Sequence, residues 1–497
     1  MRLNLRITWK NFNSTTLLLF AVFAICIQPA RAQSQDSRKQ DIQQLKNELQ
    51  QLDQKMDEIK AKINALEAAP PSRPTTPPRN PAEAQKTPEQ PQPQVAIPSE
   101  AIVAQPQLGA VPLEGEITEA ENSFNIYGFT MLDSGYDFNQ VDPLWFDVVR
   151  PTKLPSFTNQ FAPSGNVYAG VRQTRFGMKS STTTALGNLN TIFEFELFGT
   201  GIDAGQTTFR LRHAYGELGS IGAGQTWSPF MDIDVFPNTI EYWGPNGMVF
   251  FRNVQLRWMP IRRQKASVTI ALERPGASGD QGIYANRIEL SNIRPRFNFP
   301  DLSGNVRINR DWGHVQFASI VRKIGWVDTS GNPINLGGSV VGWGVNLSSN
   351  LKVSKQNLAK LEISYGHGIE NYMNDAPVDV GIGLNPPGSL VPIKGVSLPV
   401  LGLVAFLDHT WGERFTSSGG FSMVNIYNAG GQLPSDFHQG LYSVGNLLYH
   451  PIPKVMMGGE FQWGRRANFS DGFSYNDYKM QFSFKYDWSK SFTTPPL

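Results

Sequence analysis

The segment Tyr478-Lys479-Met480-Gln481-Phe482-Ser483-Phe484-Lys485-Tyr486-Asp487-Trp488 alternates without a break between apolar and polar residues. A period of two residues predicts a β-strand with one apolar face and one polar face. The alternation alone does not say whether water or lipid lies outside, because soluble sandwiches and membrane barrels both use such strands. The number of similar segments and the lengths of the connections between them therefore decide the fold.

Sixteen segments of this kind follow one another from about Phe124 to Trp488. Between the first and the last, they cover residues 171–181, 188–198, 208–218, 221–227, 250–260, 265–273, 301–310, 313–326, 338–350, 358–367, 396–410, 414–426, 439–450 and 455–464. Short connections alternate with long ones, as in 219–220 followed by 228–249. This pattern predicts an all-β transmembrane barrel of 16 antiparallel strands in the outer membrane of a Gram-negative bacterium, with both barrel ends on the periplasmic side. A solenoid or propeller is less consistent with the sequence, which has no repeat of fixed period.

The composition of the 497 residues agrees with a barrel. Only 17% of the residues are charged, below the roughly 25% of soluble domains. A mean hydropathy of -0.29 argues against a bundle of apolar membrane helices. The net charge of +2 argues against nucleic acid as a partner, because such proteins usually carry a concentrated basic face.

The N-terminus has the pattern of an export signal. Arg2, Arg6 and Lys10 precede an apolar run over 17–27, and Ala30 and Ala32 then provide small residues at the two positions that a signal peptidase reads. We therefore predict a signal peptide over 1–32. The single cysteine, Cys26, lies within it, so the mature chain is expected to have no thiol for a disulfide, a metal or catalysis.

Two non-barrel segments are predicted between the signal peptide and the barrel domain, 122–497. Residues 33–69 carry apolar positions spaced alternately by three and four, which predicts a short coiled-coil helix. Its expected core is Ile42, Leu45, Leu49, Leu52, Met56, Ile59, Ile63 and Leu66. These heptads predict self-association without deciding the number of chains. Residues 70–121 include ten prolines between positions 70 and 98, which is typical of a semi-rigid extended linker.

Four stretches of the barrel segment also resemble a known family. They are Thr174-Arg175-Phe176-Gly177, Phe209-Arg210-Leu211-Arg212-His213-Ala214-Tyr215, Gly224-Gln225-Thr226-Trp227-Ser228-Pro229-Phe230 and Gly244-Pro245-Asn246-Gly247. Together with the order of leader, heptads, linker and barrel, they resemble the DcaP-like trimeric porins of Gram-negative bacteria. The resemblance implies a homotrimer of barrels in outer-membrane lipid, with the coiled coil in the periplasm. It also implies passive diffusion of small hydrophilic solutes that include organic anions such as dicarboxylates.

Strand parity predicts which side chains line the pore. A charge facing lipid costs roughly 2 to 4 kcal/mol at the membrane midplane, so charged residues belong inside. The expected basic wall is Arg175, Lys179, Arg210, Arg212 and Arg257, and the expected acidic pore-lining residues are Glu194 and Glu196. The two glutamates have an alternative role, pairing with Arg175 and Arg212 in a structural ladder across strands.

The segment 228–249 occupies the position of the loop that folds into the lumen in porins of this kind. Its acidic residues, Asp232, Asp234 and Glu241, are the expected constriction-loop residues. Facing the basic wall, they would create a transverse field across the constriction, and the arginines would bind carboxylates. The alternative is an ordinary surface loop with solvated acids.

Motifs for catalysis, metals or cofactors are missing. The six histidines are scattered, no nucleophile elbow or phosphate loop is present, and His213 is expected to be a packing or interfacial residue. The acids in 232–234 and 371–379 lack the spacing of a calcium loop. We therefore predict a channel without cofactor or metal that is not an enzyme. Two alternatives stay open: a periplasmic tether, with the coiled coil contacting periplasmic components or peptidoglycan, and an outer-membrane hydrolase.

Overall fold

The computed structural model describes residues 122–331 and 333–494. The predicted signal peptide, coiled coil and proline-rich linker lie outside these residues. The barrel strands are β1 (Asn122–Asp137), β3 (Arg175–Thr184), β4 (Gly187–Phe198), β5 (Thr207–Leu218), β6 (Ile221–Trp227), β7 (Arg252–Arg263), β8 (Ala266–Glu273), β10 (Asp301–Arg310), β11 (Gly313–Asp328), β12 (Gly338–Lys352), β13 (Asn357–His367), β16 (Pro399–Thr410), β17 (Phe415–Ile426), β18 (Phe437–Tyr449), β19 (Val455–Asn468) and β20 (Ser474–Thr494).

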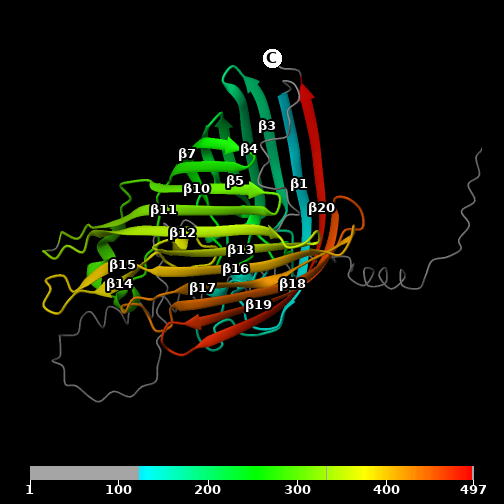
Figure 1. Ribbon diagram of the computed structural model, residues 1–497. Coiled ribbons are helices and arrows are strands. Elements are labelled where there is room, and N and C mark those ends of the chain that lie inside the picture. The colour runs from blue at the N-terminus through cyan, green and yellow to red at the C-terminus, as the bar shows by residue number, and fades with distance from the viewer. Residues whose placement is uncertain (1–121, 332, 495–497) are drawn as a thin grey trace, which may run out of the picture. The chain divides into compact units, whose positions relative to one another are not determined.

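These 16 strands form a closed antiparallel ring. Each strand pairs with the next, and β1 pairs with β20 from Asn122↔Thr494 to Asp137↔Lys479. Figure 1 shows β1 and β20 side by side, so the first and last strands close the barrel. The start of β1 also lies beside the β3–β4 turn, since Ser123 pairs with Ser181. Both ends of the barrel are therefore at the edge of the short turns, as the sequence predicts.

Shorter elements lie in the long connections. They are the strands β2 (Asn166–Gly170), β9 (Ile293–Pro295), β14 (Val380–Leu384) and β15 (Ile393–Ser397), and the 3-10 helices η1 (Pro143–Trp145), η2 (Pro151–Lys153), η3 (Gly201–Asp203), η4 (Ile233–Val235), η5 (Gly282–Tyr284), η6 (Ile288–Asn292) and η7 (Glu370–Tyr372). The sequence patterns indicated none of the four short strands. The predicted strand 171–181 begins only at Arg175. Beside β1, β3 pairs with residues 123–129, and the short strand β2 pairs with residues 133–137 farther along.

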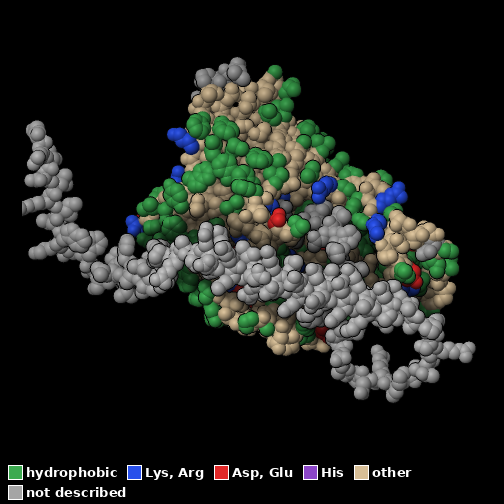
Figure 2. Space-filling model, turned by 180° about the vertical axis from the view of Figure 1, so that it is seen from behind, with side chains coloured by type: hydrophobic (Ala, Val, Ile, Leu, Met, Phe, Trp, Pro, Cys, Tyr) green, Lys and Arg blue, Asp and Glu red, His purple; other side chains and the backbone are tan. Residues whose placement is uncertain are grey.

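In β20 the apolar side chains face outward and the polar side chains face inward, the reverse of the arrangement in a soluble sandwich. Phe482 and Phe484 are 56% and 41% exposed on the outer wall, whereas Lys479 and Gln481 are fully buried inside the barrel. The same holds on β7, where Val254, Leu256 and Trp258 face outward. Figure 2 shows hydrophobic side chains gathered over the outer wall seen from behind. An apolar exterior around a polar interior is the arrangement that lipid requires.

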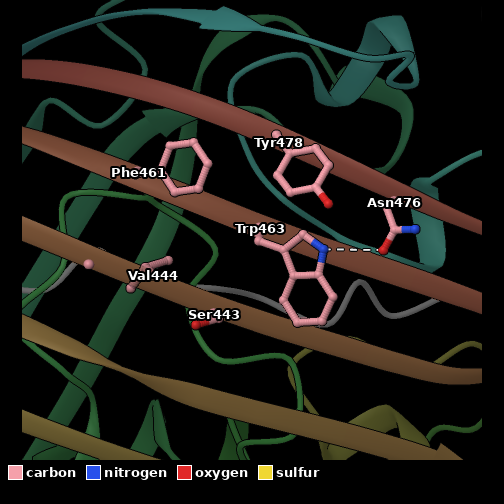
Figure 3. A pocket seen from close by; sticks show the side chains of 7 residues that line it. Ser443, Val444, Phe461, Trp463, Asn476 and Tyr478 are labelled. Atoms are coloured by element: carbon pink, nitrogen blue, oxygen red, sulfur yellow. Dashed lines mark hydrogen bonds between the residues drawn. The ribbon is translucent and has the colours of Figure 1, made fainter.

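The outer wall also carries a shallow groove of about 550 Å³ across β18, β19 and β20. Small residues of β18 lie beside Phe461, Trp463 and Tyr478, and the Trp463 indole donates a hydrogen bond of 3.2 Å to Asn476 (Figure 3). The groove opens on the membrane side of the wall and is separate from the lumen.

Candidate functional site

Strands β3, β4, β5 and β7 place arginine and glutamate together inside the barrel. We call this the arginine–glutamate cluster; its members are Arg175, Arg210, Arg212, Arg252, Glu194 and Glu196. Glu196 lies 3.0 Å from Arg175, 2.7 Å from Arg210 and 2.8 Å from Arg212. Glu194 accepts a hydrogen bond of 2.6 Å from Arg212 and one of 2.8 Å from the Tyr127 hydroxyl. The two glutamates thus form the cross-strand ladder that the sequence left as an alternative.

A β-bulge between β4 and β5 turns two neighbouring side chains of β5 into the barrel. The β4–β5 register shifts between Glu194 and Phe195, so that both Arg212 and His213 of β5 turn inward. Simple alternation places only one of two neighbours inside, and the sequence pattern therefore missed the inward His213. Its ring packs 4.8 Å from that of Trp227, and its Nδ1 lies 3.0 Å from the Thr226 hydroxyl. His213 is a buried packing residue of the lumen and does not lie at a membrane interface.

The two other predicted basic residues contact neutral groups. The Lys179 ammonium lies 5.0 Å from the centre of the Tyr127 ring, and the Arg257 guanidinium donates to Gln255 at 3.1 Å and to the Trp227 carbonyl. Both side chains are partly exposed, whereas Arg175 and Arg212 are only 3% and 1% exposed. Lys179 and Arg257 are therefore more accessible to a solute than the buried arginines of the cluster.

The connection 228–251, between β6 and β7, folds into the barrel. Its backbone N–H groups at Gly247 and Val249 donate to Ser422 and Glu362, at 2.9 Å and 2.6 Å. Ser422 and Glu362 are inward residues of β17 and β13, far across the sheet from β6. The loop thus spans the lumen.

The loop acids do not face the predicted arginine wall. Asp232 lies 2.6 Å from His314 and 3.2 Å from Arg307, and Asp234 pairs with the same arginine. These partners belong to β10 and β11. Burial raises the pKa of Asp232, but the hydrogen bond and charge of His314 and the charge of Arg307 outweigh it, so the pKa is lowered.

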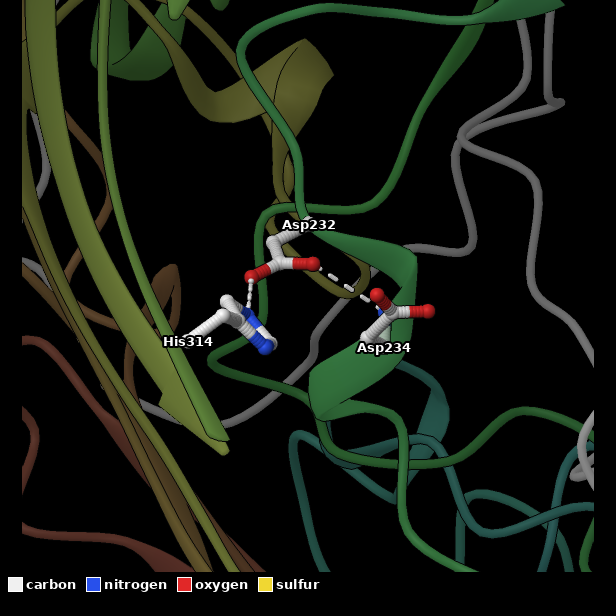
Figure 4. Close-up of side chains that lie close together, drawn as sticks. All are labelled: Asp232, Asp234 and His314. Carbon is white, nitrogen blue, oxygen red and sulfur yellow. Dashed lines mark hydrogen bonds and ion pairs between the residues drawn. The ribbon is translucent and has the colours of Figure 1, made fainter. Parts of the chain in front are cut away.

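Asp232, Asp234 and His314 bring three possible metal ligands within 4.8 Å of one another (Figure 4). Arg307 already forms ion pairs with both carboxylates. Its positive charge would repel an added cation at the same place. The other acidic stretch, 371–379, is held in the same way, since Asp375 pairs with Arg150 at 2.9 Å and Asp379 with Arg322 at 2.7 Å. These carboxylates anchor loops through arginines.

Glu241 lies on another side of the lumen, among hydrogen-bond donors. It accepts from the backbone N–H groups of Val149 and Trp243, both at 3.0 Å, and from the Tyr442 hydroxyl at 3.0 Å. Burial raises the pKa of Glu241 to about 7, against the effect of these backbone donors, and the nearby charge of Glu460 adds to the rise. The carboxyl therefore secures the loop tip rather than facing the open lumen.

Tyr242 is the loop residue that reaches the arginine–glutamate cluster. Its hydroxyl donates to Glu196, and its ring stacks on Phe198 with centroids 3.7 Å apart. The acidic residues of the loop gave no indication of this tyrosine. The available signal in the sequence is the group of aromatic residues in the same loop, Phe236, Tyr242 and Trp243.

Apolar side chains fill much of the remaining interior. Phe230, Phe250 and Tyr372 belong to a buried cluster formed by the inward connections 138–174, 228–251 and 368–398 together with the wall. The sequence could not reveal this cluster, because strand parity says nothing about residues in loops. The inward loops narrow the lumen, and they leave the wall around Lys179 and Arg257 partly exposed.

Comparisons with known proteins agree with this architecture. The chain matches the family model described as DcaP outer membrane protein over residues 111–374, just over half of its length. No curated protein gave a match. Among the residues that the structure describes, no helix is long and apolar enough to cross a membrane.

The comparison with solved structures gives a channel and a porin as examples. The outer membrane channel DcaP of Acinetobacter baumannii is 19% identical, with a TM-score of 0.59 over 76% of this chain and all of that one. An anion-selective porin from Comamonas acidovorans is 9% identical, with a TM-score of 0.49 over 74% of this chain and all of that one. With the 16-stranded barrel, its apolar exterior and the family match in hand, the chain belongs to the DcaP outer membrane protein family, whose members are porins of the outer membrane rather than enzymes.

Proposed function

We propose that this porin passes small hydrophilic solutes by passive diffusion and favours organic anions such as dicarboxylates. The supporting observation is the charge of one wall. Strands β3 to β7 carry eight arginine and lysine residues against three glutamates. Within the arginine–glutamate cluster, four arginines share two glutamates, which leaves a formal charge of +2 beside the lumen.

In this proposal the basic residues have two different roles, one structural and one in attracting anions. Arg175 and Arg212 are buried and hold the wall together through Glu194 and Glu196. Lys179 and Arg257 are partly exposed and contact neutral groups, so they act as the anion-attracting residues. Arginine can bind a carboxylate through two parallel hydrogen bonds, and binding in a channel must be weak enough to permit release.

The proposed assembly is a homotrimer with a periplasmic coiled coil. The heptads in 33–69 support self-association, and the number three comes from the resemblance to DcaP-like trimeric porins, which share the layout of signal peptide 1–32, linker 70–121 and barrel 122–497.

Reversal potential in a salt gradient tests the preference. The purified oligomer is placed in planar bilayers, and a Lys179→Gln/Arg257→Gln variant is compared with Arg287→Gln, which removes a charge from a solvated surface loop. We expect anion selectivity that falls in the double variant and stays unchanged in the control. Cation selectivity of the native protein, or equal potentials in all three proteins, would overturn the proposal.

A tethering role is the second candidate, and the heptad segment favours it. Deleting residues 33–120 separates the two roles. Unchanged solute flux with a weakened cell envelope would make tethering the main role, whereas loss of flux only after changes in the barrel would support the channel.

A further inference from the structure

Three basic residues project outward near the long-loop edge of β8 to β11. Arg274 follows β8, Arg296 follows β9, and Lys323 lies on β11; all three side chains are exposed. We call Arg274, Arg296 and Lys323 the outer basic patch. In outer-membrane barrels the long loops are extracellular, so this patch lies at the outer rim.

The strand register places the patch directly beyond the lipid-facing band. Leu302 pairs with Leu272 on one side and with Val321 on the other, and these three side chains are 48%, 47% and 53% exposed. Arg274 and Lys323 lie two residues farther toward the loops, which is about 7 Å along a strand and on the same outward face. On the outer face of these strands, a row of apolar side chains is thus followed directly, toward the loops, by a row of basic side chains.

Arg296 extends the basic row toward the loops. Its backbone N–H donates to the Gly325 carbonyl at 2.8 Å, which sets it beside β11 just past Lys323. Its guanidinium donates to the Asn298 side chain at 3.0 Å, and the Lys323 ammonium lies 5.1 Å from the centre of the Phe299 ring. The contacts of these two cations are therefore with neutral groups.

The carboxylates of the same strands point the other way. Glu273 accepts a hydrogen bond from Ser228 inside the barrel, and Asp301 pairs with the buried Arg322 at 2.9 Å. In the neighbouring loop, Glu289 is 3.0 Å from Arg287. The outward surface at the patch is consequently positive, while its acidic neighbours are engaged elsewhere.

We propose that the outer basic patch binds the phosphorylated head group of an outer-leaflet lipid whose acyl chains lie on Leu272, Leu302 and Val321. Guanidinium and ammonium groups at a membrane surface attract phosphate, and arginine binds it through a planar pair of donors. The apolar row on the membrane side of the patch favours a lipid over a soluble anion. A lipid could contact the apolar row with its acyl chains and the basic row with its head group at the same time. The site lies outside the lumen and does not depend on the solute preference proposed above.

Lipid binding to the full-length oligomer in detergent tests the proposal. Native mass spectrometry would compare diphosphorylated lipid A with its dephosphorylated form. The variant Arg274→Gln/Arg296→Gln/Lys323→Gln is matched by Arg263→Gln/Arg310→Gln/Lys352→Gln, which removes three exposed charges from the opposite rim. Retention of the heat-resistant oligomer would establish that each variant is folded.

We expect preferential binding of the phosphorylated lipid, at least about tenfold weaker in the patch variant and unchanged in the control, since each basic residue near an anionic surface contributes roughly fivefold. Equal affinity in both variants, or equal binding of the dephosphorylated lipid, would overturn the proposal. So would displacement of the lipid by inorganic phosphate at the lipid's own concentration, because that would identify a site for the free anion.

Discussion

Neutralising Glu196 by Glu196→Gln should destabilise the barrel strongly. The carboxylate is fully buried and lies within 3.0 Å of Arg175, Arg210 and Arg212. Removing one partner from a buried ion pair leaves uncompensated charge and costs about 3 to 5 kcal/mol. Because four arginines of the cluster would then share Glu194 alone, we expect a loss at the upper end of that range.

Urea unfolding of the barrel in lipid vesicles, followed by tryptophan fluorescence, measures this loss. The matched control is Glu289→Gln, which removes a carboxylate 3.0 Å from Arg287 where both side chains are more than 40% exposed. Ion pairs between solvent-exposed side chains contribute little to stability, so the control should be nearly neutral. Pairing Glu196→Gln with Arg210→Gln should restore part of the loss, since both members of one pair are then absent. A loss below about 1 kcal/mol for Glu196→Gln, or strict additivity in the double variant, would refute the view that the cluster is a structural ladder.

Two further predictions concern the inward loop, 228–251. In Gly247→Ala the new methyl group would overlap the Met423 carbonyl oxygen, so the loop should shift and single-channel conductance should change. Gly445→Ala has open space at its Cβ and should leave conductance as it is. Equal conductance in both variants would contradict the close packing of the loop on β17. Burial raises the pKa of Glu241 from 4.5 to about 7, so the folded state favours the protonated carboxyl. The stability that this protonation gives the folded state is complete below the unfolded pKa and is lost as pH rises through 7. The total loss is about 3 kcal/mol. Hydrogen exchange of residues 228–251 should therefore be faster at pH 8.5 than at pH 5.5 beyond the intrinsic pH effect, and Glu241→Gln should abolish that difference; a native loop whose protection is the same at both pH values would show that the carboxyl does not titrate there.

The sequence by itself determined the strands and the sense of their faces. Sixteen segments of period two, separated alternately by short and long connections, predicted all 16 barrel strands, because alternation is a local property of the chain. It also predicted that Arg175 and Arg257 turn inward, since the neighbouring Phe176 and Leu256 must face lipid. The resemblance based on residues 174–177, 209–215, 224–230 and 244–247 indicated the DcaP family, and the match to the family model confirmed it.

Only the tertiary structure decided which groups meet inside the barrel. The loop acid Asp232 lies against His314, 82 residues away, and Glu241 against Tyr442, 201 residues away. No local period encodes such contacts, because they depend on where a long loop turns once the ring has closed. The bulge that turns Arg212 and His213 to the same side likewise depends on how β5 fits against β4. Strand faces follow from local alternation, whereas the interior of the barrel follows from closure of the ring and the packing of its loops.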